Sequence, residues 1–119
     1  MPVRLLGSPV LRWPDGDAVR QAAGRWARDV LTQRNDVIRL GYFGSYARGD
    51  WGVGSDLDLI AVIDSSNEPF EKRAVEWDLA SLPVPTDLLV YTKEEWDSLK
   101  QGSRFFATIA AEAVWLYGN

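Results

Sequence analysis

Two aspartates at the start of an apolar stretch are the residues of this sequence most suited to binding a metal ion. Asp56 and Asp58 are separated by one leucine and are followed by the apolar run 59–63. Residues two positions apart on a strand point to the same face, so both carboxylates project together. Two carboxylates this close repel each other unless a cation lies between them. We therefore predict a divalent cation with oxygen ligands at this pair, either magnesium or manganese.

A third carboxylate, Asp87, could complete the same site. It lies near the start of a later apolar stretch, 86–91. If this stretch forms a strand beside the one that carries Asp56 and Asp58, the three carboxylates are neighbours and can hold two magnesium ions. Asp87 would then also be suited to accept a proton from an attacking hydroxyl group. The structural alternatives are a strand-edge or capping role for Asp87 and a loop cap for Asp56 and Asp58.

A glycine-serine pair, Gly44 and Ser45, has the chemistry of a phosphate-binding turn. Ten residues separate Ser45 from Asp56. Glycine lets the backbone approach a phosphate closely, and the following N–H groups and the serine hydroxyl can donate to its oxygens. No Gly-Lys-Ser or Gly-Lys-Thr sequence follows, so the pair is not a Walker loop. Arg48 could contact a triphosphate, or it could pair with Asp50 or with the acidic cluster.

The elements that position these residues are predicted from hydrophobic periodicity and turn chemistry. We predict strands over residues 37–43, 55–63, 86–91 and 114–117. Helices are predicted from the Asp15–Asp17 turn to Arg34 and over 46–48, 70–81, 93–100 and 103–113. Ser45 is expected to cap the second of these helices, and Thr92 with Glu95 forms a capping box for the fourth. This order indicates an α/β (α+β) fold, a small mixed β-sheet with helices mainly on one face.

Composition narrows the classes of function. The sequence has no histidine and no cysteine, which excludes histidine-based catalysis, thiolate sites and disulfides. Its 119 residues are 46% hydrophobic and 25% charged, which fits one domain over 1–119 with residues 1–13 as an N-terminal arm or short strand. No apolar run approaches the roughly 20 residues that span a bilayer, and no signal peptide is recognisable. We therefore expect a cytoplasmic protein without a membrane partner.

The charge is unevenly distributed along the chain. Residues 1–35 carry six arginines and three aspartates, whereas residues 36–119 carry seven basic and fourteen acidic residues, for a net charge of −4. A net acidic domain lacks the positive charge that gives non-specific affinity for nucleic acid, so we expect no stand-alone nucleic-acid binding. The basic N-terminal third could face a phosphate or an acidic partner, or it could be a solvated helix face.

The sequence contains six tryptophans, which we assign to three environments. Trp26 and Trp77 follow the apolar stripes of predicted helices and are expected in the core. Trp51 lies in the glycine-rich loop between the two motifs, where it could stack on a base or pin the loop. Aromatic residues are enriched at interfaces, and on that ground a partner surface is predicted at Trp13, Trp96 and Trp115.

Taken together, these motifs resemble the nucleotidyltransferase superfamily of DNA polymerase beta. The matching residues are Gly44 and Ser45, then Asp56 and Asp58 after the fixed gap, then a later Asp87. The flanking residues of both motifs match as well, in segments 44–49 and 55–59. The length is similar to that of the minimal nucleotidyltransferase (MNT) family, and the likeness covers roughly residues 15–117.

The resemblance implies a palm-like fold, magnesium, and ATP or another nucleoside triphosphate. It implies that Gly44 and Ser45 bind the nucleotide phosphates, with Arg48 as a further candidate. It also implies that Asp56 and Asp58 are metal ligands and that Asp87 is the third catalytic carboxylate.

Members of the MNT family commonly pair with a small helical ribonuclease toxin of the HEPN class, for which they act as antitoxins. The resemblance therefore implies AMPylation, the transfer of AMP from ATP to a hydroxyl on a HEPN-type protein within a hetero-oligomer. One alternative is a non-catalytic antitoxin that neutralises its partner by contact. Another is nucleotidyl transfer to a small molecule.

Overall fold

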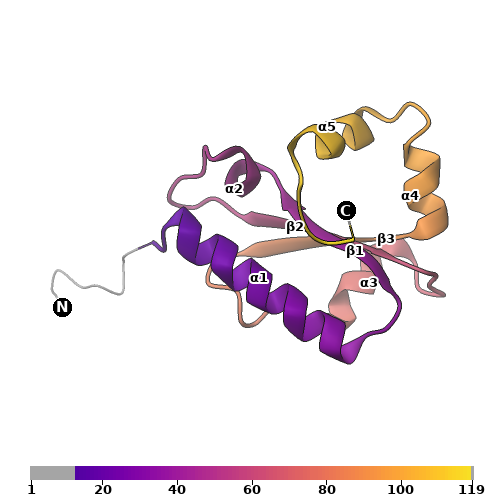
Figure 1. Cartoon of the computed structure of the whole chain (residues 1–119), viewed down its shortest axis with the longest axis horizontal. Helices are drawn as coiled ribbons and strands as arrows, with labels where there is room; N and C mark the ends of the chain where they lie inside the picture. The colour runs from indigo at the N-terminus through magenta and orange to yellow at the C-terminus, as the bar shows by residue number, and fades with distance from the viewer. Residues whose placement is uncertain (1–12, 119) are drawn as a thin grey trace, which may run out of the picture.

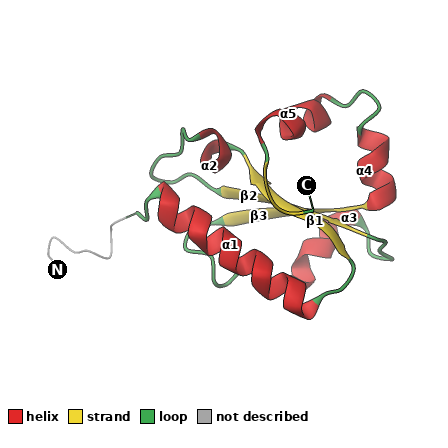
Figure 2. Ribbon diagram, viewed as in Figure 1, coloured by secondary structure: helices red, strands yellow, loops and turns green. Residues whose placement is uncertain are grey.

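Residues 13–118 are described by the structure, a computed structural model, and they build a four-stranded mixed sheet with helices (Figures 1 and 2). The strands are β1 Val37–Phe43, β2 Leu57–Ile63, β3 Thr86–Thr92 and β4 Val114–Tyr117. The helices are α1 Gly16–Gln33, α2 Ser45–Arg48, α3 Phe70–Arg73, the 3-10 turn η2 Ala74–Glu76, α4 Lys93–Leu99 and α5 Arg104–Glu112. The strand order is β3-β2-β1-β4. The mixed sheet with helices confirms the predicted α/β (α+β) fold class. Residues 1–12 of the predicted N-terminal arm lie outside the described range.

Only one pair of neighbouring strands in this sheet is parallel. Strand β2 pairs parallel with β3 and antiparallel with β1, which in turn pairs antiparallel with β4. Parallel neighbours bring equivalent ends of two strands to the same edge of the sheet. The starts of β2 and β3, which carry the predicted acidic residues, therefore lie side by side. No helix within 13–118 has the length and hydrophobicity needed to cross a bilayer.

The sheet is covered on both faces, which corrects the prediction that helices lie mainly on one face. Leu57, Leu59 and Ala61 of β2 pack in one core with α1, whereas Ile60 and Val62 pack in a second core on the opposite face. Figure 1 shows α1 and α3 on one side of the sheet and α4 and α5 on the other. Because β2 is apolar at nearly every position, both of its faces must be shielded from water.

The segment after β2 is less helical than the predicted helix over 70–81. Helix α3 and the turn η2 end at Glu76, and Trp77 is already extended, with φ −94° and ψ 136°. This change of direction brings the buried Trp77 ring within 6.2 Å of the Trp26 ring on α1. Both tryptophans are in the core, as predicted. Val75 is 81% exposed, because the regular helix that would turn its side chain inward stops here.

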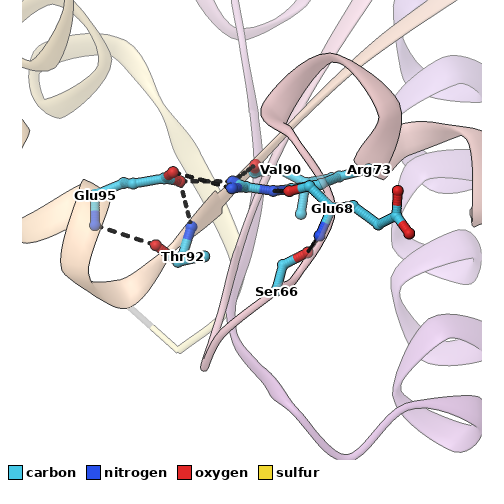
Figure 3. Close-up of polar contacts among 6 residues, drawn as sticks. All are labelled: Ser66, Glu68, Arg73, Val90, Thr92 and Glu95. Carbon is cyan, nitrogen blue, oxygen red and sulfur yellow. Dashed lines mark hydrogen bonds and ion pairs between the residues drawn. The ribbon is translucent and has the colours of Figure 1, made fainter.

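A buried arginine connects α3, β3 and α4 (Figure 3). Arg73 donates to both carboxylate oxygens of Glu95, at 2.6 and 3.0 Å, and to the carbonyl oxygens of Val90 and Glu68, each at 3.0 Å. Glu95 also accepts from the N–H of Thr92 at 2.9 Å, and the Thr92 hydroxyl accepts from the N–H of Glu95 at 3.2 Å. The predicted capping box is therefore confirmed, and the arginine ties it to the edge strand β3.

The tryptophans predicted to mark a partner surface are engaged within the chain. Trp96 is only 3% exposed and packs in the second core, so its assignment to a surface is wrong. The reason is the second helical layer, which the sequence analysis did not anticipate. Trp115 is half-buried and lies under the guanidinium of Arg39 at 4.0 Å, and the half-buried Trp13 donates to the Tyr46 hydroxyl at 3.1 Å.

Candidate active site

The Gly-Ser pair forms the turn between β1 and α2. Gly44 has φ 79° and ψ −154°, a conformation that is essentially restricted to glycine. A Cβ at this position would also overlap Oδ2 of Asp58. Ser45 is the first residue of α2, whereas the sequence predicted it as the cap of a helix beginning at Tyr46; Gly44 takes the cap position instead, and no side chain caps the helix. Glycine is thus required both for the turn and for the approach of Asp58.

The acidic residues lie at the neighbouring ends of β2 and β3, because these strands meet the condition on which the prediction depended and are adjacent in the sheet. Asp58 is the register partner of Asp87 on the parallel strand and of Phe43 on β1. Leu57 and Leu59 are buried in the first core, so Asp58 projects to the opposite face, together with Asp56 just before the strand. Asp58 is half-buried, while Asp56 and Asp87 are exposed.

Burial and like charges act together on Asp58. Its burial raises the pKa of the carboxyl above its ordinary value, and the negative charges of Asp87 and Asp56 raise it further, while Arg48 lowers it. Burial and the neighbouring negative charges thus both disfavour the ionised form of Asp58. Oxygen-only donors in such a cluster suit magnesium or manganese. Within residues 13–118, however, no three acidic side chains converge in the arrangement of a formed metal site.

Glu112, the last residue of α5, is a member of this site that the sequence analysis did not identify. Its carboxylate accepts from the N–H of Gly44 at 2.6 Å and from Nη1 of Arg48, which is 3.3 Å from each carboxylate oxygen. Arg48 also contacts Asp50 at 3.0 Å. Of the two roles predicted for Arg48, contact with a triphosphate or pairing with acidic residues, the structure contains the pairing with acidic residues. No local pattern marks Glu112, because 68 residues separate it from Gly44.

These groups surround one cleft of about 440 Å³. The cleft is lined by the turn after β1, the start of β2 and one side of α5, with the residues Phe43, Gly44, Ser45, Arg48, Asp56, Asp58, Phe105, Thr108, Ile109 and Glu112. All sequence-predicted site residues except Asp87 line it, and Asp87 is the strand neighbour of Asp58. The cleft thus brings anion donors and carboxylates into direct contact.

Trp51 lies against the protein rather than over the cleft. Its ring stacks on that of Tyr46, with centroids 5.7 Å apart and an interplanar angle of 11°. Tyr46 is buried, and the indole nitrogen of Trp51 also approaches the start of α1 at Gly16. These contacts favour loop pinning over base stacking, the two roles predicted for Trp51.

Comparisons with known proteins agree with this arrangement. Residues 25–111 match the family described as nucleotidyltransferase domain. The fold is similar to that of a candidate nucleotidyltransferase from Sulfolobus solfataricus, with a TM-score of 0.60 and 20% identity over 84% of this chain and 80% of that one. It is also similar to a chain of a toxin–antitoxin solved with AMP-PNP, with a TM-score of 0.50 and 17% identity over 81% of this chain and 73% of that one. No curated protein sequence matches the chain significantly.

Proposed function

Because this chain belongs to the nucleotidyltransferase domain family, we propose that it transfers a nucleoside monophosphate, AMP from ATP in the first instance, to a hydroxyl group. The observation that carries the proposal is that the Gly-Ser turn and the acidic residues of β2 and β3 lie next to each other. The glycine of the phosphate-binding turn lies directly against Asp58, and Asp58 pairs in register with Asp87. A nucleotide whose phosphates reach Gly44 would present them beside these carboxylates.

In this proposal the turn and the acidic cluster have different tasks. The N–H groups at Gly44 and Ser45, with the Arg48 guanidinium, bind the phosphate oxygens of the nucleotide. Asp56 and Asp58, with Asp87 beside them, would hold one or two magnesium ions, for which their oxygen donors and mutual repulsion are suited. Bound magnesium supplies positive charge that stabilises the charge developing at the α-phosphate.

The proposed reaction is an in-line substitution at the α-phosphorus. The oxygen of the acceptor hydroxyl forms a new bond to this phosphorus while the bond to the bridging oxygen breaks, and pyrophosphate leaves. The proton of the hydroxyl passes to a carboxylate, for which the exposed Asp87 is the candidate. The side chains that line the cleft include no histidine or cysteine, and Asp87 lies beside the cleft as the strand neighbour of Asp58.

We further propose that the acceptor is a tyrosine of a HEPN-type helical toxin and that this chain is its antitoxin, acting in the cytoplasm. The structural similarity to a chain of a toxin–antitoxin complex supports the antitoxin role, and the choice of a HEPN-type acceptor follows from the resemblance of the sequence to the MNT family. A second candidate, neutralisation by contact without catalysis, is favoured by the arrangement of the acidic side chains, because no three of them within the described range are positioned to hold a metal ion.

Labelled ATP separates the two candidates. The chain is incubated with α-labelled ATP, magnesium and a co-expressed HEPN-type protein, and the wild type is compared with Asp56→Ala/Asp58→Ala. Catalysis predicts that labelling of the partner falls about a hundredfold or more in the double variant. The matched control is Asp64→Ala, an exposed aspartate just beyond the opposite end of β2, which should label normally. Equal labelling by wild type and double variant would refute the catalytic role, and neutralisation without any labelling would support the contact mechanism.

A further inference from the structure

Glu112 occupies the groups that the proposed function assigns to phosphate binding. We propose that its carboxylate is a built-in competitor of the nucleotide, so that Glu112 determines the affinity of the site for polyphosphate. Binding would then require the carboxylate to leave Gly44 and Arg48. The inference rests on the proposed function in one respect, because that function identifies the ligand as a nucleoside triphosphate. The competition between Glu112 and a polyphosphate can be measured without catalysis.

The contacts of Glu112 are those of an anion in an anion-binding site. The N–H of Gly44 donates to Oε2 over only 2.6 Å, and the Arg48 guanidinium approaches both oxygens. The side chain is 15% exposed, so water competes little for these donors. A backbone N–H has one proton to donate, and a phosphate oxygen can use the Gly44 N–H only after the carboxylate has withdrawn.

Charge reinforces this competition. Glu112 lies in the same cleft as Asp56 and Asp58, and its negative charge adds to the repulsion that Asp58 already experiences. A triphosphate entering the cleft would meet the Glu112 carboxylate at the position where it needs positive charge. Withdrawal of Glu112 therefore removes both a competing acceptor and a repulsive charge, and it frees Nη1 of Arg48, while Nε of Arg48 keeps its contact with Asp50.

The backbone around Glu112 is held in place, which assigns the movement to its side chain. The following residues enter β4, where Val114 and Trp115 pair with Tyr42 and Gly41 of β1. The preceding turn is anchored by Ile109, which is fully buried and accepts from the N–H of Ala113 at 2.8 Å. Rotation about the side-chain bonds of Glu112 can release both donors without breaking these interactions.

The test compares Glu112→Gln with the wild type in binding inorganic tripolyphosphate, measured by calorimetry. Glutamine keeps the size of the side chain but loses the charge that strengthens its hydrogen bonds. Charge-assisted hydrogen bonds contribute enough that we expect the affinity to rise about tenfold or more. Glu94→Gln, which removes the same charge from an exposed position on α4, controls for net charge and should change the affinity far less.

Other results would overturn the inference. An affinity change equal to that of Glu94→Gln would mean that only net charge matters. Weaker binding by Glu112→Gln would make Glu112 part of the ligand site, and absence of binding by both proteins would mean that no anion site exists. If the glutamine variant is unstable, Glu112→Asp provides a second measurement, because its shorter side chain must also weaken the contact and tighten tripolyphosphate binding.

An NMR signal reports the competition directly. The short hydrogen bond to a carboxylate should shift the Gly44 amide proton downfield in the wild type, and this shift should decrease in Glu112→Gln and return when tripolyphosphate is added. A Gly44 signal that does not respond to either change would contradict the proposal. Failure of the labelling experiment with these responses intact would refute the proposed transfer reaction and leave the competition standing.

Discussion

The bidentate ion pair between Arg73 and Glu95 permits a quantitative prediction about stability. Replacing Glu95 by glutamine removes the negative charge but preserves the shape of the side chain and its capacity to complete the capping box with Thr92. Arg73 is only 8% exposed, whereas Glu95 is 41% exposed. The variant therefore leaves a buried guanidinium with neutral acceptors alone, namely the glutamine and the carbonyl oxygens of Val90 and Glu68.

The magnitude follows from the pKa of Glu95. The hydrogen bonds from Arg73, opposed by burial and assisted by the N–H of Thr92, lower the pKa of this carboxyl from 4.5 to about 2. Each pKa unit corresponds to about 1.4 kcal/mol, which sets a ceiling of about 3.5 kcal/mol on the contribution to the free energy of unfolding. Because the carboxylate is partly exposed and screened by water, we expect Glu95→Gln to cost about 1–2 kcal/mol at pH 7.

The sign of the pH dependence is also fixed. A carboxyl whose folded-state pKa is depressed stabilises the protein fully above its unfolded pKa, and this contribution is lost as the pH falls through the folded pKa. The difference in unfolding free energy between wild type and Glu95→Gln should therefore be constant above about pH 5, shrink between pH 4.5 and 2, and vanish below pH 2.

Urea unfolding followed by tryptophan fluorescence measures this difference at each pH. Glu94→Gln removes a charge from the same first turn of α4 and serves as the matched control for helix-dipole and net-charge effects. A difference that stays the same from pH 7 to pH 3, or one that Glu94→Gln reproduces, would refute the assignment of the stabilisation to the ion pair.

Two further substitutions test the turn between β1 and β2. Gly44→Ala places a side chain at φ 79° and against Asp58, so we expect a loss of about 1–3 kcal/mol in urea unfolding and loss of labelling from ATP; wild-type values in both assays would contradict this. Trp51→Ala removes the stack on Tyr46 and should destabilise the fold by about 1–3 kcal/mol while leaving the affinity for an ATP analogue nearly unchanged. Unchanged stability with a large loss of affinity would instead indicate that Trp51 stacks on the base.

Features determined by near neighbours in the sequence could be predicted well. The capping box of Thr92 and Glu95 requires only residues three positions apart, and the bounds of β1 and β4 follow from short apolar runs between turn residues. The adjacency of Asp58 and Asp87 was predictable only conditionally, because it depends on β2 and β3 being neighbours in the sheet. The sequence pattern indicates which face each side chain occupies, but it does not specify the order of the strands.

Features that depend on distant parts of the chain were missed. Burial of Trp96 requires a second layer of helices, whose presence follows from the apolar character of both faces of β2 rather than from any pattern around Trp96 itself. Glu112 looks like an ordinary polar residue at the end of a helix until β4 returns beside β1. In both cases the missing information is the tertiary pairing, which no local periodicity contains.

The C-terminal end of β1 is where the two halves of the site meet, and its register explains why both carboxylates approach Gly44. Phe43 is paired with Asp58 on β2, and Tyr42 is paired with Val114 on β4, two residues after Glu112. Hydrogen bonds between the strands fix this register. The backbone at Asp58 and the backbone that follows Glu112 therefore cannot move away from Gly44 without breaking strand pairs. The turn is therefore built with a negative charge on each side. Under the proposed function the two negative charges are relieved in different ways. On the β2 side, where burial and repulsion already act on Asp58, a cation would bind. On the β4 side, the side chain of Glu112 would rotate away from the turn.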